Sequence, residues 1–96
     1  GPLPAASSAA YAAIIDVRTP AEYAAGHVRG AQNIDVESAS FAGRIAGLSK
    51  GGTYLVYCRS GNRAGQAAER MKDAGLTVVN GGGLTDMQSL GYPFES

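Results

Sequence analysis

The chain has 96 residues with eight acidic and eight basic side chains; 45% of its residues are hydrophobic and 17% are charged. This length fits one domain, and this composition favours a folded core over a disordered chain. The basic residues are scattered along the sequence, so nothing predicts the extended cationic face that binding to nucleic acid or to an anionic membrane would need.

Residues 1–10 are mostly small residues and proline without any periodic pattern, which predicts a tag remnant or flexible tail. We therefore expect one domain over residues 11–96. The longest apolar run, at 9–15, is far shorter than the roughly 20 residues of a membrane-crossing helix. We expect a cytoplasmic monomer without membrane contact, and an exported mature form, with its signal peptide removed, stays open.

The first elements of the domain have clear local signals. The apolar run at 12–17 contains β-branched residues and predicts a buried strand. Thr19 as N-cap, Pro20 in the first turn and Glu22 three residues after the cap predict a short helix, which Gly26 ends.

The middle of the chain predicts a weak strand at 32–34 and then a helix that starts at Ser38 or Ser40 and ends at Leu48. Residues 53–57 are the clearest strand, because they are β-branched or aromatic and lie between glycine-containing turns.

The last third of the domain continues the alternation of strands and helices. After a turn at 58–63, small and apolar residues at helical spacing predict a helix that Gly75 ends. Residues 76–79 predict a strand, and residues 84–90 predict a helix. This order predicts an α/β fold of three layers, α/β/α, with a central parallel sheet of four or five strands.

The strongest candidate site follows the clearest strand. In parallel sheets chemistry gathers where strands end, and the only cysteine, Cys58, lies there; alone it forms no internal disulfide and no cysteine-rich zinc site. Backbone N–H groups of a tight loop, the following helix dipole and two arginines favour the thiolate. We therefore predict Cys58 as the nucleophile, and the loop after it as the anion-binding cradle: Arg59, Ser60, Gly61, Asn62 and Arg63.

Four segments of the chain, in order, resemble the single-domain rhodaneses, which are thiosulfate sulfurtransferases. They are IIDVR at 14–18, EY with GHVRGA at 22–31, CRSGNR at 58–63, and GG with GYP at 82–93. The resemblance covers roughly residues 12–94, and it implies the rhodanese-like fold.

The resemblance implies a persulfide on Cys58. A small anionic donor such as thiosulfate would give its sulfane sulfur to Cys58, which would pass it to cyanide or a thiol acceptor, with a thioredoxin-like protein among the candidates. It implies no metal and no organic cofactor.

Two other functions stay open. Rhodanese-like domains also occur as catalytically silent binding or regulatory modules. Cysteine-dependent phosphatases and arsenate reductases use a similar loop, but the phosphatases place arginine six positions after the nucleophile, where this chain has Ala64 and the arginine comes earlier, at Arg63. Asp16 or Asp86 would have to serve as the general acid of such a phosphatase.

Three further polar residues lie near the expected site. For Asp16 and Arg18, at the end of the first strand, we favour a structural role: pairing with neighbouring residues or fixing the turn before Pro20. His27 lies in an expected turn between Gly26 and Gly30, and we expect it to hydrogen-bond backbone there instead of acting as a base.

The glycine-rich segment at 81–83 and Met87 are expected to affect packing near Cys58. Residues 81–83 lack the Lys-Ser/Thr pair of a phosphate loop, so we expect their backbone to pass close to the cysteine loop. Met87 stands where rhodanese-like chains usually have tryptophan, and we expect this change to alter packing near the site.

Overall fold

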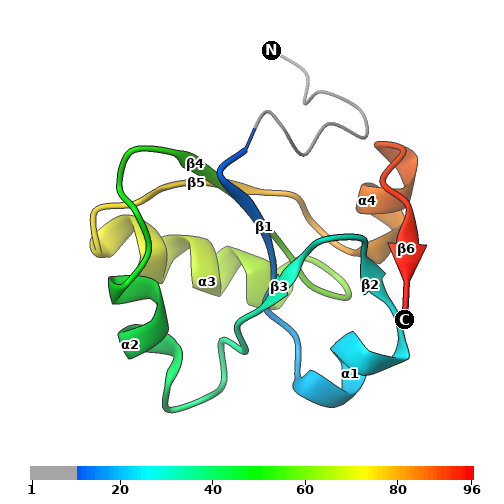
Figure 1. Cartoon of the computed structure of the whole chain (residues 1–96), viewed down its shortest axis with the longest axis horizontal. Helices are drawn as coiled ribbons and strands as arrows, with labels where there is room; N and C mark the ends of the chain where they lie inside the picture. The colour runs from blue at the N-terminus through cyan, green and yellow to red at the C-terminus, as the bar shows by residue number, and fades with distance from the viewer. Residues whose placement is uncertain (1–10) are drawn as a thin grey trace.

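The computed structural model describes residues 11–96, so the expected tail at 1–10 lies outside the described residues. A parallel four-stranded sheet crosses the domain in the order β3-β1-β4-β5 (Figure 1). Its strands are β1 (Ala13–Asp16), β3 (Gln32–Asn33), β4 (Thr53–Tyr57) and β5 (Thr77–Asn80). The predicted parallel sheet is confirmed, with the lower of the two expected strand numbers.

Helices cover both faces of this sheet (Figure 1). One face carries α2 (Phe41–Ala46) and α3 (Asn62–Asp73), and the other carries α1 (Pro20–Ala25) and α4 (Leu84–Ser89). The three-layer α/β/α architecture is therefore confirmed. None of the helices within residues 11–96 has the length and apolar character needed to span a bilayer.

Alternation along the central strands builds two separate cores. Ile15 and Val56 face the layer of α2 and α3, whereas Ile14 and Leu55 face the layer of α4, where Met87 is fully buried. Because successive side chains of a strand point to opposite faces, a strand covered on both sides is apolar throughout. That is why these strands are continuous apolar runs in the sequence.

A second, two-stranded sheet was not predicted. Strand β2 (His27–Val28) pairs antiparallel with β6 (Phe94–Glu95), so the expectation of a turn at His27 is wrong. Each strand has only two residues, too few to show a period in the sequence.

Helix α2 is shorter than predicted, because residues 38–40 form turns before its first residue, Phe41. The start of α1 is confirmed: Thr19 and Glu22 form a capping box, and Gly26 follows the helix.

The parallel register brings the loops that follow β1, β4 and β5 to one edge of the sheet. Asp16 pairs with Tyr57, and Val56 with Asn80, so β1, β4 and β5 end side by side. The Cys58 amide donates a hydrogen bond of 3.0 Å to the carbonyl of Gly82, and the Leu84 amide donates one of 3.1 Å to that of Arg59. The expected close passage of residues 81–83 is confirmed.

A substitution at Gly83 tests whether the close contact between residues 81–83 and the cysteine loop stabilises the fold. A Cβ at Gly83 would meet the carbonyl oxygen of Arg59 and lie 3.0 Å from the Cα of Ser60. We expect Gly83→Ala to lower the free energy of unfolding in urea by about 1–3 kcal/mol, because backbone on both sides must shift.

Gly43→Ala is the matched control for that substitution. Gly43 lies in α2 with nothing within 4 Å of an added Cβ. Alanine there should raise the free energy of unfolding by about 0.5–1 kcal/mol through helix propensity. Equal urea midpoints for Gly83→Ala and the wild type would show that the two loops are not tightly packed.

Candidate active site

Cys58 lies directly after β4 and is fully buried at the base of the loop that leads into α3. The Gly61 amide donates a hydrogen bond of 2.8 Å to its Sγ atom. Gly61 is the N-cap of α3, with a left-handed φ of +98°. The amide and the positive end of this 12-residue helix both favour negative charge on the sulfur.

The other residues of the predicted cradle are not all turned toward the sulfur. Within residues 11–96, Gly61 is the one backbone donor that hydrogen-bonds to Sγ. Arg59, Ser60 and Asn62 are exposed. Ser60 forms an isolated bridge with Gly83. The structure therefore shows a single hydrogen bond where the sequence suggested a ring of donors.

Arg63 is engaged by a carboxylate from another element. Its Nη1 and Nη2 atoms donate hydrogen bonds of 2.7 and 2.9 Å to the two carboxylate oxygens of Glu22 in α1. The hydrogen bond from Arg63 lowers the pKa of Glu22 to about 2, and the same contact raises the pKa of Arg63 above its ordinary value. Nη1 also lies 3.9 Å from Glu37.

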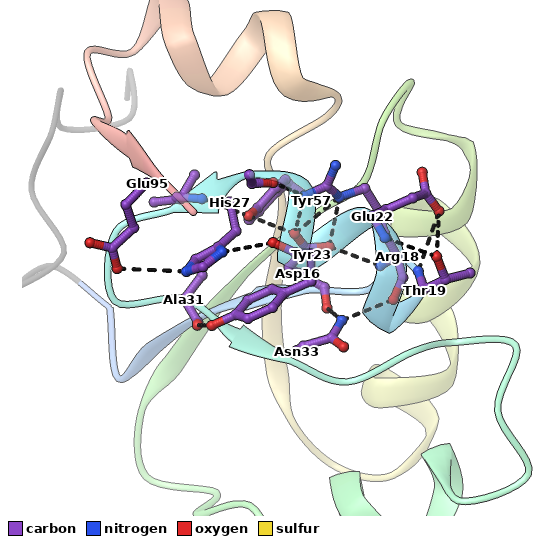
Figure 2. A network of polar contacts seen from close by, with 12 residues as sticks. Asp16, Arg18, Thr19, Glu22, Tyr23, His27, Ala31, Asn33, Tyr57 and Glu95 are labelled. Carbon is purple, nitrogen blue, oxygen red and sulfur yellow. Dashed lines mark hydrogen bonds and ion pairs between the residues drawn. The ribbon is translucent and has the colours of Figure 1, made fainter.

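Asp16 and Arg18 form a buried ion pair with each other (Figure 2). The Arg18 guanidinium donates to both carboxylate oxygens of Asp16, at 2.9, 3.0 and 2.6 Å, and to the carbonyl of Gly26 at 2.6 Å. Burial alone would lower the pKa of Arg18, but the hydrogen bond and charge of Asp16 raise it overall. The two side chains pair directly with each other, and the structural role favoured for them stays a prediction.

Tyr57, the last residue of β4, completes this buried network (Figure 2). Its hydroxyl donates a hydrogen bond of 2.8 Å to Asp16 and accepts one of 2.9 Å from the Val28 amide. Burial raises the pKa of Tyr57 above its ordinary value, so the phenol stays protonated and serves as the donor. The residue before Cys58 is thereby tied to both β1 and β2.

His27 contacts Tyr23 and Glu95. Its ring stacks on Tyr23 with centroids 3.7 Å apart, and its Nδ1 atom lies 2.8 Å from the Tyr23 carbonyl oxygen. Its Nε2 atom faces Glu95 at 3.6 Å, as Figure 2 shows. Its polar partners in the described part of the chain thus include backbone, as expected, and not Cys58.

An open cavity of about 460 Å³ adjoins the glycine loop, which consists of residues 81–83, but Cys58 does not line this cavity. The residues that line it come from β5, the glycine loop, α4 and the residue after α4: Asn80, Gly81, Gly82, Asp86, Ser89 and Leu90. Asp86, weighed as a phosphatase acid, accepts a hydrogen bond of 2.8 Å from the Gly83 amide and so holds the glycine loop.

Two residues that organise the site were not predicted to take part in it. Glu22 had a helix-capping signal and lay in a segment that resembles the rhodaneses, and Tyr57 was predicted as a strand residue, but neither was given a role at the site. An acidic residue in the first turn of a helix can form an ion pair with a residue far away in the sequence, as Glu22 does with Arg63, but the sequence alone does not identify that residue.

A buried cysteine at the carboxyl end of a parallel strand, with a tight loop and a helix N-terminus over it, defines a class of α/β domains built around a cysteine loop. Residues 4–89 match the Rhodanese-like domain family, and the chain belongs to this family.

Characterised relatives are similar over most of the chain. Thiosulfate sulfurtransferase PspE of Escherichia coli K12 is 42% identical over 74 residues, which are 76% of this chain and 71% of that protein. Thiosulfate sulfurtransferase GlpE of Pseudomonas entomophila is 37% identical over 68 residues, 71% of this chain and 61% of that protein. A solved E. coli rhodanese with anions superposes with a TM-score of 0.74 at 36% identity, covering 88% of this chain and 96% of that one.

Tyr57→Phe tests the buried network. The variant leaves the buried Val28 amide without its partner and removes one of the three hydrogen bonds that Asp16 Oδ2 accepts, so we expect it to lower the free energy of unfolding by about 1–3 kcal/mol. Tyr54→Phe is the matched control on the same strand, because the Tyr54 hydroxyl makes a half-buried hydrogen bond to the Ser49 carbonyl and should cost about 1 kcal/mol or less. Equal losses in urea unfolding would contradict a special role for Tyr57.

The Glu22–Arg63 pair predicts a pH dependence of stability. The pKa of Glu22 falls from an ordinary 4.5 to about 2 in the folded chain, so its contribution is complete above about pH 4.5 and disappears as the pH falls toward 2. Both side chains are partly exposed, which limits the contribution to about 1 kcal/mol. Urea unfolding of Glu22→Gln should therefore show a deficit against the wild type at pH 6 that vanishes near pH 2; a deficit independent of pH would contradict it.

Proposed function

We propose that this chain is a rhodanese-type sulfurtransferase that carries sulfur on Cys58. The observation that supports this proposal most directly is the Gly61 amide at 2.8 Å from Cys58 Sγ, under the N-terminus of α3. Two relatives named thiosulfate sulfurtransferase, at 42% and 37% identity, support the same reaction class.

In the first half-reaction the Cys58 thiolate attacks the outer sulfur of thiosulfate. A new S–S bond forms, the S–S bond of thiosulfate breaks, and its electron pair leaves with sulfite. The Gly61 amide and the helix dipole stabilise charge on the sulfur before and after transfer. The negative charge of the product persulfide lies on the terminal sulfur, so no proton is required.

In the second half-reaction cyanide or a thiolate attacks that terminal sulfur. The S–S bond to Cys58 breaks, its electron pair returns to Sγ, and the sulfur leaves as thiocyanate or as a new persulfide. The Cys58 thiolate is regenerated without a histidine base, and the ring nitrogens of His27 face Tyr23 and Glu95 instead of Cys58.

Access to the sulfur is the physical requirement of this chemistry. Cys58 is fully buried, while Arg59, Ser60 and Asn62 of the same loop are exposed. Sulfur transfer therefore requires the loop to open enough for a donor to reach Sγ. The complete burial of Cys58 favours, as a second candidate, a silent binding module in which the thiol is purely structural.

Mass spectrometry of the intact chain separates these functions. After exposure to thiosulfate, we expect a mass increase of one sulfur atom, its removal by cyanide, and its absence in Cys58→Ser, which keeps a polar group of similar shape. The same samples incubated with an aryl phosphate should release no phosphate.

Other outcomes of this experiment would favour a different function or a different sulfur site. No sulfur adduct between pH 6 and 9 would favour the silent module, and an adduct that persists in Cys58→Ser would place the sulfur elsewhere. Turnover of the aryl phosphate without an adduct would favour the phosphatase. Supplying persulfide-loaded chain with cyanide, glutathione or a thioredoxin-like dithiol would then rank the acceptors by the rate of sulfur loss.

A further inference from the structure

Three arginines lie at the edge of the sheet that carries Cys58, and two of them form ion pairs with carboxylates. Arg18 is paired with buried Asp16, and Arg63 with Glu22. Arg59 is exposed and, within the described residues, forms no ion pair. The loop that carries two arginines in the sequence therefore offers one unpaired guanidinium to an incoming anion.

The Glu22 carboxylate competes with an anionic donor for the guanidinium of Arg63. A guanidinium binds a planar or tetrahedral oxyanion through two parallel N–H groups. Both terminal nitrogens of Arg63 already donate to Glu22, at 2.7 and 2.9 Å. A sulfonate can form this same two-nitrogen contact only by displacing the Glu22 carboxylate, and at the remaining N–H groups it meets a cation whose charge Glu22 already balances.

Glu22 is held in place independently of Arg63. Its Oε1 atom also accepts hydrogen bonds of 3.3 Å from the Thr19 amide and 3.1 Å from the Thr19 hydroxyl, which fix it to the first turn of α1. With a pKa of about 2, the carboxylate stays charged at any pH suited to the reaction. Displacing it would break contacts to two residues at once.

We propose that Glu22 sets the anion selectivity of the Cys58 site: it neutralises Arg63 and leaves Arg59 as the cation that binds an anionic sulfur donor. Glu22 is thus a positioning residue that acts through Arg63. The inference rests on the proposed function for the identity of the donor, and it reverses the expectation that both loop arginines bind it.

Alkylation of Cys58 measures this selectivity without sulfur transfer. Iodoacetate carries a negative charge and iodoacetamide carries none, yet both react at the same sulfur. The ratio of their second-order rate constants therefore cancels changes in loop opening and in the thiolate fraction, and reports the charge that an approaching anion meets.

Glu22→Gln should raise the iodoacetate-to-iodoacetamide ratio about three- to tenfold, because it frees the charge of Arg63 near the sulfur. Glutamine at this position retains the capping box, so α1 should keep its N-terminus. Glu69→Gln, an exposed charge removal within α3, is the matched control and should leave the ratio unchanged.

The arginine variants complete the test. Arg59→Gln should lower the ratio about three- to tenfold, and so should Arg63→Gln, which leaves Glu22 unpaired. The double variant E22Q/R63Q should return to within about twofold of the wild type, because it removes a neutral pair. The KM for thiosulfate should fall in Glu22→Gln, with a smaller change in kcat.

The outcomes separate this inference from the proposed function. A reactive Cys58 whose ratio is the same in Glu22→Gln and Glu69→Gln would overturn the role of Glu22 and leave sulfur transfer intact. A double variant as low as Arg63→Gln would likewise overturn it, because Arg63 would then bind the anion itself. A wild-type chain that neither reagent modifies would overturn the proposed function, and the inference with it.

Discussion

The hydrogen bond from the Gly61 amide to Cys58 Sγ depends on a backbone conformation that favours glycine. Gly61 has a φ of +98°, in the left-handed region that residues with a side chain rarely adopt. Gly82 in turn accepts a hydrogen bond from the Cys58 amide, so the two loops position each other. Backbone therefore determines the geometry at the sulfur, and the surrounding side chains determine its charge and access.

The charges around the loop largely cancel, which agrees with the formal net charge of zero for the whole chain. Asp16 and Arg18 form a buried pair, and Glu22 and Arg63 a half-buried one. A buried pair is costly to desolvate and is retained where further hydrogen bonds satisfy it, as the Gly26 carbonyl and Tyr57 hydroxyl do here. These pairings leave little excess positive charge on Arg18 and Arg63 for anion binding.

Local signals in the sequence predicted most of the fold, and contacts between distant residues account for what it missed. The start of α1 depends on Thr19, Pro20 and Glu22, which lie within one turn of each other, so the sequence contains the whole cause. The pairing of β2 with β6 joins residues 27–28 to residues 94–95, and neither strand has a period of its own. Likewise, Cys58 and its loop were identifiable locally, whereas the partner of Arg63 lies 41 residues away.

The buried hydroxyl of Tyr57 explains how so small a domain fixes its cysteine. Tyr57 directly precedes Cys58, and its hydroxyl links β4 to Asp16 at the end of β1 and to the Val28 amide of β2. Because β2 pairs with β6, the end of the chain is connected to the residue before the nucleophile through two strands. The short second sheet therefore supports the end of β4, because its Val28 amide adds a second hydrogen bond to a Tyr57 hydroxyl that Asp16 already holds from the side of β1.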